Sequence, residues 1–166
     1  ILILAKKRLA LVELQEQMKK NQITKEYFAL TLGAWRDEKR NVKTPIYKYT
    51  NKDGERRVRI DQELGQFSHT IFTLKKKYAE FSLVNADLQT GRTHQIRIHL
   101  QYLGFPIAGD DKYGNFEQNK LLAKQGLKRM FLHAHHVKFM HPMTQQTLEV
   151  NCPLAPELAS FLSKLS

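Results

Sequence analysis

Hydrophobic and polar positions alternate with two different periods along this chain, and each period predicts a different kind of element. Residues 1–5 are a short apolar run that includes β-branched residues, which predicts a buried strand. Residues 6–21 predict a helix that ends at Asn21. The apolar residues that recur there at helical spacing are Leu11, Leu14 and Met18. Residues 24–35 predict a second strand, which ends near Gly33.

Turn-forming residues divide the rest of the chain into shorter elements. The Asn-Lys-Asp-Gly sequence at residues 51–54 predicts a hairpin turn, and the alternation that follows it is typical of a half-buried strand. Longer elements are predicted as strands at residues 68–74, 78–88 and 131–140, a basic turn at residues 75–77, and a final amphipathic helix at residues 155–165. Successive strands with helices at intervals favour the α+β class, with a mixed, largely antiparallel sheet flanked by helices.

Residues 91–114 carry the densest group of polar side chains in the chain, with two arginines, two histidines and a glutamine in eight residues. Thr93 is placed to cap a helix that Gly104 ends. One face of this helix is apolar and holds Ile96, Leu100 and Leu103. The opposite side holds Gln95, His99 and Tyr102, with Arg97 at its flank. Polar donors beside an apolar stripe are typical of a pocket for a charged substrate, and a helix amino terminus favours anions.

The balance of charges narrows the choice of partner. The 166 residues include 27 Lys and Arg against 16 Asp and Glu, which gives a formal net charge of +11. These basic residues are spread along the chain instead of being confined to one tail. In a folded domain this pattern favours a polyanion partner, and nucleic acid is the usual one. The length suits one domain, or the larger part of one.

Other features concern the cellular setting. Cys152 is the single cysteine, which excludes an internal disulfide and suits a reducing compartment. No apolar run approaches the roughly 18 residues of a membrane span, so we expect no membrane partner. We also expect a cytoplasmic protein and a monomer. The chain does not begin with Met and opens inside an apolar run, so we expect it to be part of a longer protein.

Several ordered motifs together resemble one enzyme family. Residues 91–100 read Gly-Arg-Thr-His-Gln-Ile-Arg-Ile-His-Leu, and residues 104–114 read Gly-Phe-Pro-Ile-Ala-Gly-Asp-Asp-Lys-Tyr-Gly. Shorter matches are Lys25-Glu26-Tyr27, Phe-Leu-His-Ala at 131–134 and Phe-Met-His-Pro at 139–142. Along its whole length the chain is similar to the RluA-type RNA pseudouridine synthases, and most similar to the branch that acts on the large ribosomal subunit. Phe105 stands where that branch has histidine, a position outside the motif residues with catalytic roles.

The resemblance implies isomerisation of uridine to pseudouridine in RNA, here 23S-type ribosomal RNA, without a cofactor. The base must be flipped out of its stack, detached from C1′, turned and rejoined through C5. The family's nucleophile is an aspartate in a His-Arg-Leu-Asp loop directly before an apolar strand that ends in Ala-Lys. Residues 1–6 match that strand, and the loop is not in this sequence. We therefore expect residues 1–166 to be part of a catalytic domain, without the nucleophile loop or the S4-type domain, and inactive alone.

The resemblance also assigns roles to individual residues. Tyr27 matches the tyrosine that stacks on the target base and accepts the C5 proton, which requires a lowered pKa. Arg97 matches the arginine that pairs with the nucleophilic aspartate, a role that suits a bidentate guanidinium. Leu132 matches the apolar residue of the base pocket. The residues that we expect to contact RNA phosphate and ribose are Lys25, Arg92, His94, Gln95 and His99.

Three other interpretations remain to be weighed. The first is a non-catalytic basic module that binds RNA and lacks the nucleophile. The second is a metal site built from the histidines near residue 135 together with Cys152, but no metal-ligand spacing is met and His136 is expected to point away from His133 and His135. The third is a phosphoesterase that uses His94, Arg97 and His99, whose side chains diverge on one helix. The sequence favours the pseudouridine synthase interpretation, with no metal.

Overall fold

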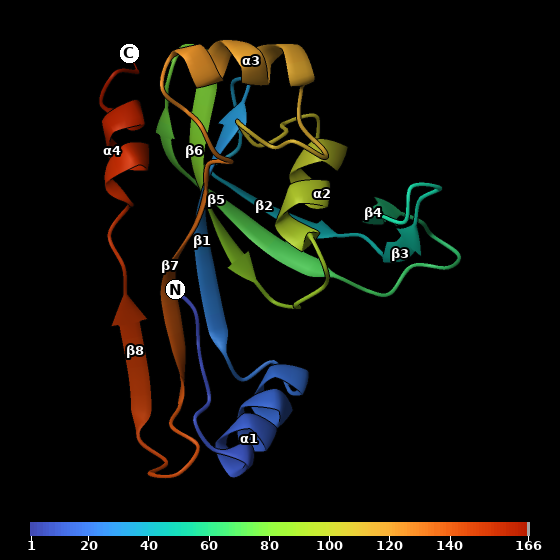
Figure 1. The fold of residues 1–166 in the computed structure, drawn as a ribbon, viewed down its shortest axis with the longest axis vertical. Coiled ribbons are helices and arrows are strands. Elements are labelled where there is room, and N and C mark those ends of the chain that lie inside the picture. Colours follow the sequence, from blue (N-terminus) through green and yellow to red (C-terminus); the bar gives the residue numbers. More distant parts are fainter. Residues whose placement is uncertain (166) are drawn as a thin grey trace.

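The computed structural model describes residues 1–165 and contains a sheet, a separate hairpin and four helices (Figure 1). In chain order the elements are α1 (Arg8–Lys19), β1 (Thr24–Leu32), β2 (Lys39–Lys43), β3 (Ile46–Thr50), β4 (Arg56–Ile60), β5 (His69–Lys77), β6 (Phe81–Leu88), α2 (Gln95–Tyr102), α3 (Phe116–Lys124), β7 (Leu132–Met140), β8 (Thr147–Asn151) and α4 (Pro156–Leu162). The strand order of the sheet is β2-β5-β6-β1-β7-β8, and every neighbouring pair is antiparallel. The predicted α+β class with a largely antiparallel sheet is confirmed.

The two faces of the sheet are covered by different helices. Successive residues of a strand point to opposite faces, so Ala29 and Leu30 in the central strand β1 belong to two different apolar clusters. Ala29 packs with Phe72 of β5 and with Ile96 and Leu100 of α2. Leu30 packs in a second cluster with residues of α3 and α4. Helix α2 therefore lies over one face of β1, and this face positions the candidate site.

The hairpin formed by β3 and β4 projects from the sheet beside α2 (Figure 1). Its turn is the predicted one, because the side-chain oxygen of Asn51 accepts hydrogen bonds from the backbone N–H groups of Asp53 and Glu55. A small apolar cluster of Ile46, Val58, Ile98 and Tyr113 attaches the hairpin to α2. The hairpin is therefore connected to the polar segment of the chain by direct packing.

The prediction of a strand at residues 1–5 is wrong, because these residues form no regular element. Strand β7 already has a hydrogen-bonded neighbour on each side, β1 and β8, so it offers no free edge to a further strand. The segment instead packs Ile3 and Ala5 against a cluster that includes Leu14 and Val137. In addition, the amino group of Ile1 donates a hydrogen bond to the carbonyl oxygen of Ala134 at 3.1 Å.

Two further details differ from prediction. The basic residues 75–77 complete β5 instead of forming a turn, because a register shift after Leu74 keeps them paired with β6. Helix α1 ends near the expected residue, but the apolar face proposed for it is only partly buried. Leu14 is 6% exposed, whereas Leu11 and Met18 are 47% and 44% exposed.

Candidate active site

Strand β1 places Lys25 and Tyr27 on the face of the sheet that α2 covers. Tyr27 lies opposite Ala134 of β7, and Ala29 lies opposite Leu132, so Leu132 is on the same face as the tyrosine ring. Both Tyr27 and Leu132 pack against the cluster that contains Ile96 and Leu100 of α2. Two residues that the motifs single out more than 100 positions apart are thus on one surface.

Burial sets the protonation of Tyr27 and Lys25. It raises the pKa of the Tyr27 phenol, so its hydroxyl is protonated at neutral pH. It lowers the pKa of the Lys25 ammonium, which the negative charge of Asp87 partly opposes. The lowered tyrosine pKa that proton acceptance requires is therefore not found in this structure.

Arg97 is a buried ion-pair partner of Asp110. Its Nε and Nη2 atoms donate to the two carboxylate oxygens at 2.8 and 2.6 Å, and Nη2 also donates to Asp111 at 3.1 Å. Arg97 and Asp110 are 9% and 1% exposed. Burial opposes both charges, but the pair outweighs it, so the pKa of Arg97 is raised and that of Asp110 is lowered. This bidentate geometry fixes the plane of the guanidinium.

The same carboxylate organises the turn that carries it. One oxygen of Asp110 also accepts hydrogen bonds from the backbone N–H groups of Lys112 and Tyr113, at 2.9 and 3.0 Å. The turn lies between two glycines that have no room for a side chain. A Cβ at Gly109 would lie 2.6 Å from the carbonyl oxygen of Arg129, and one at Gly114 would lie 2.3 Å from that of Asp110. Gly109 also has a φ of +77°.

Tyr113 joins the hairpin to this ion pair. Its hydroxyl accepts a hydrogen bond from the backbone N–H of Val58 in β4 at 3.0 Å. The hydroxyl lies 3.0 Å from Nδ1 of His94 and is free to donate to it. The guanidinium of Arg97 lies over the tyrosine ring, 5.0 Å from its centre. A single side chain therefore contacts the hairpin, the start of α2 and the buried arginine.

The beginning of α2 differs from the predicted cap. His94, not Thr93, is the N-cap residue, and it adopts a left-handed conformation with a φ of 51°. Its side chain caps no backbone N–H of the helix. The side-chain oxygen of Gln95 instead braces the segment before the helix, because it accepts hydrogen bonds from the N–H of Arg92 and the hydroxyl of Thr90.

Two residues predicted to contact RNA are inside the protein. Gln95 and His99 are 2% and 0% exposed. The hydroxyl of Ser68 donates to the carbonyl of Thr44 and so accepts from Nε2 of His99 at 2.8 Å, while the hydroxyl of Thr70 donates to Nδ1 at 2.9 Å. Burial lowers the pKa of His99 to about 4, which agrees with this neutral ring. These two residues support α2, and their predicted contact with RNA is corrected.

The remaining predicted contacts stay accessible. Arg92 is exposed, and its Nε donates to the carbonyl of Phe67 at 3.1 Å. His94 is partly exposed, and burial together with the nearby charge of Arg97 lowers its pKa. Lys25 lies next to Gly91, where a Cβ would be 3.5 Å from the lysine Nζ. Lys25, Arg92 and His94 thus remain candidates for contact with a polyanion.

Aromatic and basic side chains gather on the outer face of the hairpin, which the sequence motifs do not single out. Arg59 lies over the rings of Tyr47 and Tyr49, 5.3 and 5.7 Å from their centres. Aromatic rings combined with arginine are typical of surfaces that bind single-stranded nucleic acid. The available signal was the alternation of aromatic and basic residues in β3 (Tyr47, Lys48 and Tyr49), a segment for which no strand was predicted.

The histidines of β7 lie on the other face of the sheet. A register shift in β1–β7 pairing places His133 opposite Phe28 and His136 opposite Glu26. His135 stacks on Phe28 with ring centres 3.7 Å apart, so the prediction that His136 alone points away is wrong. Within residues 1–165 no group of three His, Cys, Asp or Glu side chains is arranged to hold a metal ion. In the same range, no helix combines the length and apolar character that crossing a bilayer requires.

Comparison with known proteins identifies relatives along the whole chain. A sequence model of a family described as RNA pseudouridylate synthase matches residues 1–102. Ribosomal large subunit pseudouridine synthase C of Pasteurella multocida (strain Pm70) is 45% identical over 165 residues, which cover 99% of this chain and 50% of the relative. The protein of the same description from Escherichia coli (strain K12) is 44% identical over 167 residues and is covered to 52%. The chain thus spans about half the length of these curated relatives.

Solved structures agree with these relatives. Human RNA pseudouridylate synthase domain containing 1 superposes with a TM-score of 0.76 at 26% identity, over 95% of this chain and 66% of that one. Human RNA pseudouridylate synthase domain containing 4 superposes with a TM-score of 0.74, over 96% of this chain and 69% of that one. At 22% identity this second likeness concerns the fold alone.

Proposed function

This chain belongs to the RNA pseudouridylate synthase family, and on that premise we propose that it forms part of an enzyme that isomerises uridine to pseudouridine in RNA. The proposed substrate is 23S-type RNA of the large ribosomal subunit, which the names of the curated relatives support. The net charge of +11 suits such a polyanion. The observation that carries the proposal is the buried guanidinium of Arg97, held in a fixed plane on the helix that covers Tyr27 and Leu132. We also propose a cytoplasmic monomer.

The proposed role of Arg97 is to hold the nucleophilic carboxylate. Asp110 and Asp111 engage its Nε and Nη2, and Nη1 makes no hydrogen bond within residues 1–165. Nη1 is therefore available to a further acceptor, in a guanidinium whose plane Asp110 already fixes. A donor oriented before the substrate binds stabilises a developing charge without reorganising during the reaction.

The nucleophile itself is proposed to lie in a segment that precedes Ile1. The two carboxylates beside Arg97 are poor candidates. Asp110 is 1% exposed and both of its oxygens accept hydrogen bonds, while the side chain of Asp111 is 84% exposed. The family resemblance places the aspartate directly before the apolar segment that corresponds to residues 1–6.

Tyr27 is proposed to stack on the flipped uracil, with Leu132 as the apolar neighbour of the base. The raised pKa of the phenol supports stacking, because a protonated hydroxyl cannot accept the C5 proton. For the tyrosine to act as a base, its pKa must fall when RNA and the nucleophile are in place.

The decisive experiment measures the loss of the C5 proton. A longer polypeptide that joins the nucleophile loop to Ile1 is incubated with ribosomal RNA that carries tritium at C5 of uridine. We expect release of tritium from this polypeptide and no release from residues 1–166 alone, which should still bind RNA. In the longer polypeptide, Arg97→Lys should lower kcat by at least about tenfold, because lysine cannot reproduce the bidentate fork.

The tyrosine variant separates its two proposed roles. Tyr27→Phe keeps the ring for stacking, so RNA affinity should stay within about threefold, whereas a role in proton transfer predicts a loss of kcat of about 10²–10⁴-fold. Arg8→Lys, at an exposed arginine at the start of α1, is the matched control and should leave kcat unchanged. Release of tritium by residues 1–166 alone contradicts the proposed location of the nucleophile. A longer polypeptide that binds RNA without releasing tritium favours the non-catalytic module.

A further inference from the structure

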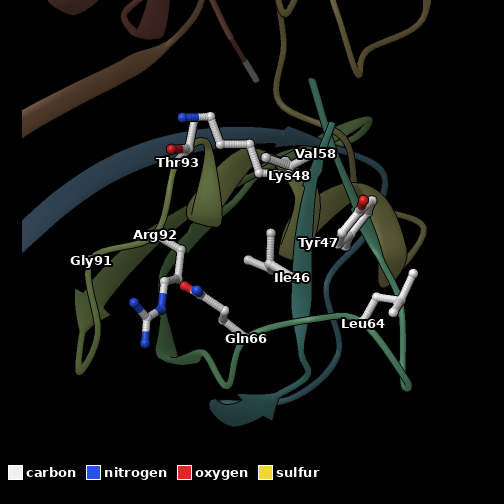
Figure 2. Close-up of a pocket in the computed structure, with 9 residues that line it drawn as sticks. All are labelled: Ile46, Tyr47, Lys48, Val58, Leu64, Gln66, Gly91, Arg92 and Thr93. Atoms are coloured by element: carbon white, nitrogen blue, oxygen red, sulfur yellow. The ribbon is translucent and has the colours of Figure 1, made fainter. Parts of the chain in front are cut away.

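A cavity of about 380 Å³ lies between the hairpin and residues 91–93, which lead into α2 (Figure 2). This volume is within the range of about 300–1,000 Å³ that is typical of small-ligand sites. The apolar part of its wall comes from Ile46 and Val58, which are 4% and 2% exposed, and from Leu64, which is 61% exposed. Exposed polar residues surround its opening: Lys48, Gln66, Arg92 and Thr93.

The charges around this cavity favour an anion. Among residues 1–165, neither Asp nor Glu lines it, and within the same range Lys48 and Arg92 have no ion-pair partner. The two arginines on the outer face of the hairpin do have ion-pair partners, because Arg57 pairs with Glu55 and Arg59 pairs with Asp61. Uncompensated positive charge is therefore concentrated on the side of the hairpin that faces α2.

The hydrogen-bonding groups at the cavity are also available to a ligand. The bond from Arg92 Nε to the Phe67 carbonyl fixes this side chain, and its two terminal nitrogens have no partner within residues 1–165. The side-chain amide of Gln66 likewise makes no hydrogen bond in the described chain, and it offers both a donor and an acceptor. An apolar wall beside such an amide suits a nucleobase, whose faces are apolar and whose edges form hydrogen bonds.

The position of the cavity connects it to the site on β1. Gly91 lines the cavity, and a Cβ at this residue would lie 3.5 Å from Nζ of Lys25. Lys25 is two residues from Tyr27 on the same face of the strand. An RNA strand whose target uracil lies on Tyr27 would therefore bring a neighbouring nucleotide to this cavity, with Lys25 between the two.

We propose that the cavity binds one unpaired nucleotide of the RNA that neighbours the target uridine. Its base packs on Leu64 beside Ile46 and Val58 and bonds through its edge to Gln66, while its phosphate contacts Lys48 and Arg92. The inference rests on the proposed function and deepens it, because a second base-binding subsite makes the enzyme sensitive to the sequence that surrounds the target. No covalent step takes place at this subsite.

The test uses 11-nucleotide unstructured RNAs with one central uridine. One nucleotide at a time, at the two positions on each side of the uridine, is replaced by an abasic ribose, and Kd for residues 1–166 is measured by fluorescence anisotropy. We expect the loss of one particular base to weaken binding at least about fivefold, as for a stacked base, and the loss of the others to have smaller effects. Gln66→Ala should reduce that penalty to less than about twofold.

Gln62→Ala is the matched control, because this exposed glutamine of the same turn does not line the cavity and should keep the full penalty. Gln66→Met, which keeps the length of the side chain but removes its amide, repeats the comparison if Gln66→Ala fails to fold. Equal small losses at all four positions, or a full penalty in both cavity variants, would overturn the subsite and leave RNA as the substrate. Failure of the unaltered chain to bind any of these RNAs would overturn the proposed function as well.

Discussion

The carboxylate of Asp110 holds the guanidinium of Arg97 at two nitrogens, with Nε–Oδ2 and Nη2–Oδ1 distances of 2.8 and 2.6 Å. The same carboxylate accepts two backbone hydrogen bonds from its own turn. The conformation of the turn and the orientation of the arginine are thus set by one side chain. Arg97 was recognisable in the sequence as a carboxylate partner, and the partner within this chain is a residue that the motif comparison had left without a role.

Loss of the charge on Asp110 should destabilise the fold. Asp110→Asn leaves the buried guanidinium without its main counterion, which is expected to cost about 3–5 kcal/mol of unfolding free energy. Asp111→Asn is the matched control, because its side chain is 84% exposed, and it should cost less than about 1 kcal/mol. Urea unfolding of both variants at neutral pH measures the difference. Equal losses in the two variants contradict the central role of Asp110.

The hydroxyl of Tyr113 should hold the hairpin against α2. Tyr113→Phe keeps the ring beneath Arg97 but leaves the buried N–H of Val58 without its acceptor, at a cost of about 1–3 kcal/mol. Hydrogen exchange of the Val58 amide should accelerate more than that of the central strand β1. Tyr102→Phe, at an exposed tyrosine of α2, should leave this amide unchanged. Unchanged exchange in Tyr113→Phe would show that apolar packing alone holds the hairpin.

Protonation of His99 should weaken the fold in mild acid. Its pKa is about 4 in the folded chain, against about 6.5 in the unfolded chain, so only the unfolded state takes up the proton between these values. Above pH 6.5 the ring is neutral in both states, so its protonation does not change stability with pH. As the pH falls from 6.5 to 4, the free energy of unfolding should decrease by about 3 kcal/mol, at about 1.4 kcal/mol per pH unit. Urea titrations of the unaltered chain and of His99→Gln should differ in slope across this range, and identical slopes would contradict the assignment.

Arg92 should make a single phosphate contact. The logarithm of the RNA association constant should fall with the logarithm of salt concentration, and Arg92→Ala should reduce that slope by about 1. Lys124→Ala, at the end of α3 and away from the hairpin, is the control and should leave the slope unchanged. The measurement uses residues 1–166 and a short single-stranded RNA at several salt concentrations. Binding that hardly depends on salt contradicts an interface dominated by phosphate contacts.

The sequence was most informative where a side chain's environment is local. Strands β1, β4, β5, β6 and β7 were predicted, and the alternation in β4 reports directly which of its faces is buried. The amphipathic pattern failed for Gln95 and His99, which were assigned to a solvent face. The side-chain N–H group of Gln95 and both ring nitrogens of His99 bond to β5 and to the residues directly before it, about 25–31 positions away. No local pattern reveals that polar groups so distant will meet.

Competition between segments explains the other errors. Residues 1–5 have the composition of a strand, but strand formation depends on a free sheet edge, and β8 occupies the available edge of β7. Strand β8 itself was not predicted, because all five of its residues are exposed and carry no burial signal. Strand β2 is similar, since Val42 is its single buried residue. Both are edge strands whose existence depends on a neighbour.

The two glycines that enclose the Asp110 turn affect how a mutational screen of this segment should be interpreted. Neither Gly109 nor Gly114 has space for even a methyl group, so alanine at either site must displace the backbone that carries Asp110. In a saturation screen for activity, both positions should be as intolerant as residues that touch the substrate. An intolerant position in this segment is therefore no guide to chemistry by itself. Pairing the activity screen with an abundance screen would separate the two classes, since loss at the glycines should appear in both.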